Sequence, residues 1–251
     1  MIIPTYLFYF IAAGTVAVLI TILYGLNRAL ADAHWPAADR TRTLRVSAVI
    51  LLGWLAVAIT LSAMGIYHVT SGDRPTIQYG ILLPILIGAL MIWRSETTKR
   101  VIAAVPQQWL VGVQLYRALG AIFLILYATG KLPGLFAWPS AVGDIAIGLS
   151  APVVGLAYAR APDKAAGLVA AWNVLGLLDL IDALGLGFFT APSRFALEIQ
   201  PTSDLMTVLP LVLVPVYLVP LSIVLHIASL AKLRREAGAT PGHCRVADAR
   251  A

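Results

Sequence analysis

The fold is decided by the stretch Ala171-Trp-Asn-Val-Leu-Gly-Leu-Leu-Asp-Leu-Ile-Asp182, an apolar run that carries one asparagine and two aspartates. It lies inside a longer apolar segment, 165–189, and a helix needs about 20 such residues to cross a bilayer. An ionisable group at that depth costs at least ~2.5–3.5 kcal/mol on insertion scales. Asp179 and Asp182 are therefore expected to have a partner or a function within a membrane protein.

The composition of the whole chain agrees with this interpretation. Of 251 residues, 60% are hydrophobic and only 12% charged, and the mean hydropathy is +0.87. These values predict an all-α, polytopic membrane protein without a sizeable soluble domain. The single cysteine, Cys244, excludes a disulfide framework and a cysteine-based metal site. The net charge of +6 does not indicate nucleic acid binding, because the basic residues flank the apolar runs.

The apolar segments form a single predicted seven-helix transmembrane domain over 1–230, followed by a basic tail over 231–251. The predicted crossings are 4–26, 46–67, 77–93, 109–129, 141–159, 165–189 and 207–230. The segment 95–105 starts with charged residues and then becomes apolar, a pattern typical of a short interfacial helix. The segment 130–140 is rich in glycine, proline and aromatic residues, which predicts a loop at the membrane surface.

The distribution of lysine and arginine predicts the orientation of these crossings. Seven crossings put the termini on opposite sides, and the side that carries the tail holds 14 basic residues against 3 on the other. The positive-inside rule then places the N-terminus outside and the C-terminus in the cytoplasm. The expected location is the cell membrane, which is the inner membrane if the source is bacterial, with the lipid bilayer as a partner.

Four ionisable residues lie well within the predicted crossings, and two amides accompany them. The ionisable residues are Arg117, Asp144, Asp179 and Asp182, and the amides are Gln114 and Asn173. At a rise of ~1.5 Å per residue, Asp144 and Asp182 lie about 7–10 Å from the outer face and Asp179 about 15 Å. Arg117 lies about 12 Å from the inner face by the same arithmetic. We therefore expect Arg117 to reach outward to Asp179, and Asp144 and Asp182 to share a site at matching depth.

The spacing of small residues predicts that the aspartates face other helices. Small side chains mark the faces on which membrane helices approach closely. The two stripes are Ser140, Asp144, Gly148, Ala151 and Gly155 in one segment, and Gly176, Asp179, Ala183 and Gly187 in the next. Gln114 and Arg117 are three residues apart and share a face. Asn173 is rotated about 120° from Asp179, which favours a separate, structural contact.

Charge balance leaves two interpretations open: a buried Arg117–Asp179 ion pair that only locks the helices, with Asp144 and Asp182 in contact with outer water, and a proton- or cation-linked site. Three carboxylates against one guanidinium leave an excess of negative charge, which favours a bound proton or cation in a low dielectric. The first hypothesis is a proton- or cation-linked carrier or channel with its site between 109–129, 141–159 and 165–189. The small-molecule or cation ligand is not identified by the sequence, and a homo-oligomer is compatible with it.

Two alternative functions remain open. The first is an intramembrane enzyme acting on a lipid or isoprenoid, with an aspartate as general acid; it requires a cavity ending at Asp144 or Asp182. The second is a non-catalytic receptor, assembly factor or cofactor-carrying subunit. His68 and His226 are placed at opposite ends of the crossings, so no shared metal site is expected, and no cofactor or catalytic residue is identified. The prolines at 210, 215 and 220 are typical of a curved or cavity-lining helix.

Overall fold

The computed structural model describes residues 4–70 and 74–239, and this part of the chain is helical with no strand. Within it, seven helical segments are long and apolar enough to cross a membrane. The elements are α1 (Thr5–Asp32), α2 (Ala37–Ala63), α3 (Ile77–Arg94), α4 (Glu96–Ala104), α5 (Gln107–Gly112), the 3₁₀ helix η1 (Val113–Ala121), α6 (Ile122–Ala128), α7 (Gly134–Arg160), α8 (Pro162–Thr190), η2 (Asp204–Thr207), the π-helical turn η3 (Val214–Leu218) and α9 (Val219–Ala239).

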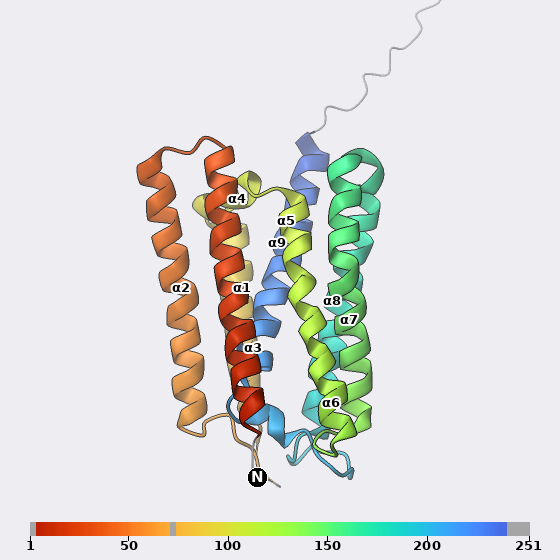
Figure 1. Cartoon of the computed structure of the whole chain (residues 1–251). Helices are drawn as coiled ribbons and strands as arrows, with labels where there is room; N and C mark the ends of the chain where they lie inside the picture. Colours follow the sequence, from red (N-terminus) through yellow and green to blue (C-terminus); the bar gives the residue numbers. More distant parts are fainter. Residues whose placement is uncertain (1–3, 71–73, 240–251) are drawn as a thin grey trace, which may run out of the picture.

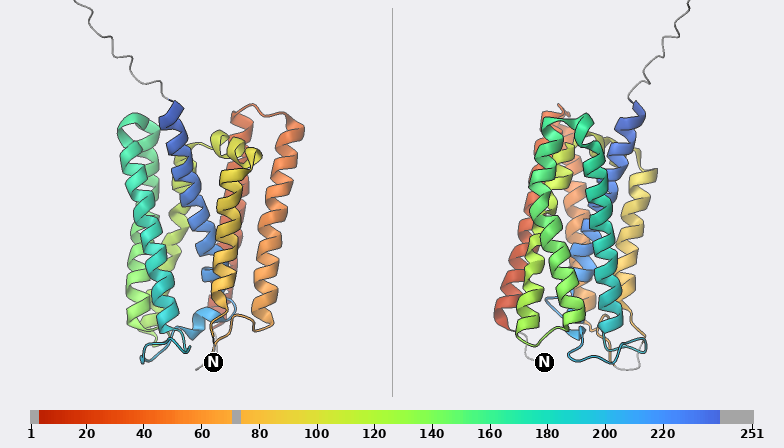
Figure 2. Two further views of the ribbon diagram at one scale, coloured as in Figure 1. Left: turned by 180° about the vertical axis from the view of Figure 1, so that it is seen from behind. Right: turned by 90° about the vertical axis from the view of Figure 1, so that its right-hand side faces the viewer.

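The long helices run side by side as a bundle (Figure 1). The N-terminus, the α2–α3 link, the α6–α7 link and the segment 191–213 lie at one end, which we call the N-terminal end. The α1–α2 link, α4, the α7–α8 link and the end of α9 lie at the other, the C-terminal end (Figures 1 and 2). Helix α2 lies at the edge and its apolar window is only 6% buried, as expected for a surface that faces lipid.

The seven predicted apolar segments and the segment 95–105 are confirmed as helical, but two predicted boundaries are wrong at the start of the chain. Helix α1 continues to Asp32 and α2 begins at Ala37, so the predicted link over 27–45 shrinks to 33–36. The reason is that alanine, arginine and leucine are good helix formers with or without lipid around them. Helices therefore continue past the point where hydropathy falls.

The prediction of a loop over 130–140 is also wrong for most of this segment. Helix α7 begins at Gly134, directly after Pro133 at its N-cap, and includes Pro139. Asp144 is ten residues into this helix, about 15 Å from its start at the α-helical rise. It therefore lies about twice as deep as the sequence arithmetic indicated. This shift brings it level with Asp179, which lies about 16 Å from the last residue of α8, Thr190.

The last crossing is not the uninterrupted helix predicted over 207–230. Residues 208–212 form bends and turns, the π turn covers Val214–Leu218, and α9 continues to Ala239. Proline lacks the backbone N–H that an α-helix requires, and Pro215 falls inside the π turn. The first part of the predicted basic tail is thus helical, and the rest, with Cys244, lies outside the described residues.

Helix α9 ties the C-terminal end together through its basic residues. The Lys232 ammonium donates to the carbonyl oxygen of Ala103 at 2.7 Å, and the Arg235 guanidinium donates to that of Ile92 at 3.2 Å. These carbonyls belong to the last turns of α4 and α3, where backbone acceptors lack helical partners and cations are favoured. Both helices are thereby fixed against α9.

Candidate functional site

A 3₁₀ helix positions the central residues of the site. In η1 the buried residues are Gln114, Arg117 and Gly120, which follow one another at intervals of three. A 3₁₀ helix has 3.0 residues per turn, so residues three apart lie one above the other. The predicted shared face of Gln114 and Arg117 is thus confirmed, and it points into the bundle, where these two side chains are almost fully buried.

The same 3₁₀ stretch explains how Arg117 reaches the aspartates. Its rise is about 2.0 Å per residue against 1.5 Å in an α-helix. Counted from Gln107, the first residue of α5, Arg117 lies about 17 Å into the bundle by these rises. A regular α-helix from Trp109 gave only about 12 Å. About half of this gain comes from the earlier helix start at Gln107 and about half from the larger rise of the 3₁₀ helix, so both bring Arg117 closer to Asp179.

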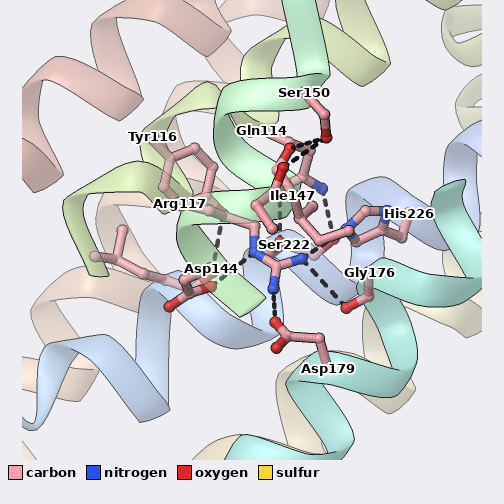
Figure 3. Close-up of polar contacts among 12 residues, drawn as sticks. Gln114, Tyr116, Arg117, Asp144, Ile147, Ser150, Gly176, Asp179, Ser222 and His226 are labelled. Carbon is pink, nitrogen blue, oxygen red and sulfur yellow. Dashed lines mark hydrogen bonds and ion pairs between the residues drawn. The ribbon is translucent and has the colours of Figure 1, made fainter. Parts of the chain in front are cut away.

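Arg117 lies at the centre of the site and contacts side chains and backbone from the surrounding helices (Figure 3). Its Nε donates to Asp144 Oδ1 at 2.8 Å, and its Nη2 donates to Asp179 Oδ2. Its Nη1 donates to the carbonyl oxygen of Gly176 and lies against His226 Nε2, both at 3.2 Å. The Arg117 side chain is 2% exposed, and those of Asp144 and Asp179 are 15% and 16% exposed. The predicted Arg117–Asp179 pair is confirmed, and Asp144 is a second partner that the sequence did not predict.

Asp182 is not part of this cluster. It is exposed, and within the described residues it makes no hydrogen bond or salt bridge. The expected pairing of Asp144 with Asp182 is therefore replaced by pairing of Asp144 with Arg117. The reason is the depth of Asp144, which lies further from the start of α7 than predicted. It is therefore level with Asp179, and Asp179 is about one helical turn away from Asp182.

A chain of buried hydrogen bonds leads from Arg117 toward the C-terminal end. His226 Nδ1 lies 2.8 Å from Asn173 Oδ1, and Asn173 Nδ2 donates to Ser229 Oγ at 2.9 Å. Gln107 Nε2 donates to the same hydroxyl at 2.6 Å. Because a guanidinium N–H can only donate, His226 Nε2 accepts from Arg117, and Nδ1 carries the ring proton toward Asn173. His226 is thus held as a neutral acceptor in one tautomer.

This chain of hydrogen bonds tests two of the sequence predictions. The structural contact expected of Asn173 is confirmed, although it connects to Arg117 through His226. The prediction for His226 is wrong, because α9 extends to Ala239 and leaves this side chain fully buried in the bundle. The signal that was overlooked is the spacing of Ser222, His226 and Ser229, which places three polar residues on one helical face within an apolar run.

Two further contacts fix η1 against the π turn and α9. Gln114 Nε2 donates to the carbonyl oxygen of Ser222 at 3.1 Å, and the Ser222 hydroxyl donates back to Gln114 Oε1 at 2.6 Å. The Tyr116 hydroxyl donates to the carbonyl oxygen of Leu218, the last residue of the π turn, at 3.0 Å. Side chains of the 3₁₀ helix therefore bond to backbone carbonyls of both the π turn, at Leu218, and the first turn of α9, at Ser222.

Glycines leave room for the charged side chains. A Cβ at Gly143 would overlap the carboxylate of Asp179, and one at Gly176 would lie 2.5 Å from the imidazole of His226. Gly176 belongs to the predicted stripe of small residues, whereas Gly143 lies outside it, and both glycines allow α7 and α8 to approach the cluster closely.

Asp144 also lines two cavities on the side of the cluster nearer the N-terminal end. A cavity of about 190 Å³, which we call the α3–α8 cavity, lies among α3, α6, α7, α8 and the segment 191–219. A smaller space of about 50 Å³ lies between α1 and η1, and Arg117 lines it as well. A third cavity of about 280 Å³ lies among α1, α2, α3, α4 and α9 at the C-terminal end.

The chemistry available at the cluster is that of protons and ion pairs. Among the described residues, no group of three or more histidine, cysteine, aspartate or glutamate side chains is placed to hold a metal ion. Two carboxylates share one guanidinium beside a neutral histidine, so the cluster carries one excess negative charge when both acids are ionised. One proton or one external cation would balance it.

The comparison with protein families adds a classification. A family model described as "Domain of unknown function (DUF8737)" matches residues 74–234, more than half of the chain. The chain belongs to this family. No curated protein and no solved structure matches it. The matched part begins just before α3 and ends within α9, so it contains Arg117, both of its aspartates and the hydrogen-bond chain, but neither α1 nor α2.

Proposed function

We propose that this protein is a proton-linked membrane carrier whose proton-binding centre is Arg117 with Asp144 and Asp179. The observation that carries the proposal is the sharing of one buried guanidinium by two carboxylates on different helices, next to a cavity that Asp144 lines. Intramembrane ionisable residues that pair with one another mark proton and substrate pathways in transporters.

The cluster provides a physical means of coupling proton binding to helix movement. With both acids ionised, Arg117 holds η1 to α7 through Asp144 and to α8 through Asp179. A proton on Asp144 removes the charge that binds it to Arg117, while the Asp179 pair balances the guanidinium. Helix α7 then loses its ionic link to η1, and the carbonyl of Gly176 and His226 continue to hold the arginine.

The interrupted helices also favour a carrier. Carrier sites lie near the middle of the membrane and are commonly built from discontinuous helices. Here the cluster sits on a nine-residue 3₁₀ stretch, whereas such runs rarely exceed 3–4 residues and often mark hinges. The π turn at Val214–Leu218 adjoins it through Tyr116. These two irregular segments are the natural places for the backbone to bend.

We also propose that the N-terminal end faces the outside. The basic residues of the described chain in or near the C-terminal end are Arg28, Arg40, Arg42, Arg45, Arg94, Lys99, Arg100, Arg160, Lys164, Lys232, Arg234 and Arg235, against Arg74, Lys131 and Arg194 at the N-terminal end. Reporter fusions after Lys131 and after Arg194 should show periplasmic or external activity, and a fusion after Arg40 should be cytoplasmic. A cytoplasmic signal at Lys131 would overturn the assignment.

Proton-linked movement can be tested without knowing the substrate. In a Cys244→Ser background, Ala183→Cys places a thiol on the α3–α8 cavity and Ser47→Cys places one on the cavity at the C-terminal end. Acidification from pH 8 to pH 5 should change the two labelling rates in opposite directions, each by about threefold or more, because one side opens as the other closes. The readout is maleimide labelling of the protein in liposomes, with each rate divided by the rate of the same thiol in the denatured protein at the same pH, because only the thiolate reacts and its fraction falls on acidification.

The matched controls are two aspartate variants. Asp144→Asn should fix the labelling rates at values independent of pH, since the residue can no longer lose or gain charge. Asp182→Asn, an exposed acid outside the cluster, should leave the pH response unchanged. Labelling rates that do not depend on pH at either cysteine, or a response that survives Asp144→Asn and Asp179→Asn separately, would contradict the proposal.

A second candidate function is supported by one observation. An intramembrane enzyme acting on a lipid or isoprenoid requires an apolar cavity that reaches an acid, and Asp144 lines the largely apolar α3–α8 cavity. An enzyme would convert a lipid that a carrier leaves intact. Mass spectrometry of isoprenoid and lipid extracts incubated with the purified protein distinguishes the two, with Asp144→Asn as the inactive control.

A further inference from the structure

We propose that the α3–α8 cavity binds a small protonated amine that carries an aromatic or similarly compact apolar group. The inference rests on the proposed function in one respect only, which is that this ligand would be the carried substrate. Binding itself depends on the cavity, on Asp144 and on Gln78, and can be tested by itself.

The size and lining of the cavity set the apolar part of the ligand. Its volume is about 190 Å³, and an apolar cavity of about 150 Å³ accommodates benzene. One ring with a short side chain therefore fits. Phe123, Phe136 and Phe188 line the cavity, and the rings of Phe123 and Phe136 lie 5.5 Å apart. Aromatic faces attract both apolar rings and cations.

The polar groups that line the cavity are hydrogen-bond acceptors, which favours a ligand with hydrogen-bond donors. Asp144 lines it, and within the described residues only Oδ1 of this carboxylate is hydrogen-bonded, which leaves Oδ2 as an acceptor. Gln78, on α3, lines the same cavity, and its buried Oε1 has no hydrogen-bond partner in the described part of the chain. Buried acceptors normally have a donor. An ammonium group offers three N–H donors and the opposite charge to Asp144.

An anionic ligand does not suit the cavity. Among the described residues, the only buried cation near it is Arg117, whose Nε and Nη2 are bonded to carboxylates and whose Nη1 is bonded to Gly176 and His226. Arg117 itself lines the smaller space beside α1 and not the α3–α8 cavity. A carboxylate in the cavity would therefore meet Asp144 without a free guanidinium to offset it.

The amine also explains how a ligand could act on the cluster. An ammonium at Asp144 Oδ2 supplies the positive charge that balances the excess carboxylate, as a proton would. Amine and proton would then compete for the same charge, which is the relation that a proton-linked exchanger of cations requires.

The test uses three probes with the same ring and different charges: 2-phenylethylamine, 2-phenylethanol and phenylacetate. Binding to the purified full chain in nanodiscs at pH 7.5 is measured by isothermal titration calorimetry. The amine should bind at least about tenfold more tightly than the alcohol, as expected for one charge-assisted hydrogen bond, and phenylacetate should show no binding. Equal affinities of amine and alcohol would overturn the proposal, since they would indicate a purely apolar cavity.

Two variants assign the site. Asp144→Asn should reduce the difference between amine and alcohol to less than about twofold. Ala183→Phe fills the cavity from a residue that makes none of the Arg117 contacts and should abolish binding of both probes, so that the result does not depend on the Asp144 variant alone. Unchanged amine binding in Ala183→Phe would place the amine elsewhere and contradict the inference. Amine binding without pH-dependent cysteine labelling would reject the carrier and keep the ligand class.

Discussion

Replacing Arg117 with alanine is expected to destabilise the protein by about 3–5 kcal/mol, the cost of breaking a buried ion pair by removing one partner. The guanidinium is 2% exposed and its partners are only 15% and 16% exposed, so water cannot replace it fully. Its loss leaves Asp144 and Asp179 facing each other without a cation, and leaves His226 Nε2 without its donor. Unfolding in detergent, followed by circular dichroism, measures the change.

The decisive comparison is with variants that also remove the unpaired carboxylates of Asp144 and Asp179. Arg117→Ala combined with Asp144→Asn and Asp179→Asn should recover much of the lost stability, because neutral amides are far cheaper to bury than unpaired carboxylates. Arg28→Ala is the matched control, since Arg28 pairs with Asp32 at 3.4 Å on an exposed surface and should cost less than about 1 kcal/mol. Additive losses in the triple variant would show that the three side chains do not act as one unit.

The number and approximate position of the seven long apolar helices were predictable from the sequence, because hydropathy reflects a requirement of the bilayer. A helix in lipid must satisfy its backbone internally and present apolar side chains over its whole length. What hydropathy does not determine is where a helix ends outside the lipid. For that reason α1, α2 and α9 extend beyond the predicted segments and α7 begins before its predicted start.

The site was predictable only in part. Charge balance alone indicated that Arg117 needs a carboxylate, and Asp179 was the deepest one available. Asp144 and His226 were misplaced because both depth estimates used wrong helix ends. The 3₁₀ geometry of η1 could not be predicted either, since the hydropathy of this segment fits any helical period, and the tertiary contacts to Ser222 and Leu218 help to hold the observed one. Tertiary packing thus decides the details that local sequence leaves open.

Close packing of α7 against η1 is expected to make Gly148→Ala strongly destabilising. A Cβ at this position would lie 2.5 Å from the backbone nitrogen of Ala118 and 3.2 Å from its Cα. Unlike the end of a flexible side chain, these atoms cannot rotate away, so the two helices must separate. We expect a loss of about 1–3 kcal/mol, typical of an overpacked core. It should exceed the intrinsic gain of about 0.5–1 kcal/mol that alanine brings to a helix.

The matched control is Gly185→Ala on α8, where a Cβ would meet nothing within 4 Å. With the same chemical change and no clash, this variant should be neutral or stabilised by up to about 1 kcal/mol. Because Ala118 follows Arg117 directly and Gly148 lies one turn after Asp144, separation at Gly148 also pulls the ion pair apart. Gly148→Ala should therefore weaken the pH response of the labelled cysteines, and Gly185→Ala should preserve it. Equal stability of Gly148→Ala and Gly185→Ala would contradict this prediction. It would mean that η1 moves away from α7 without loss of stability, so that their close approach does not hold the arginine cluster together.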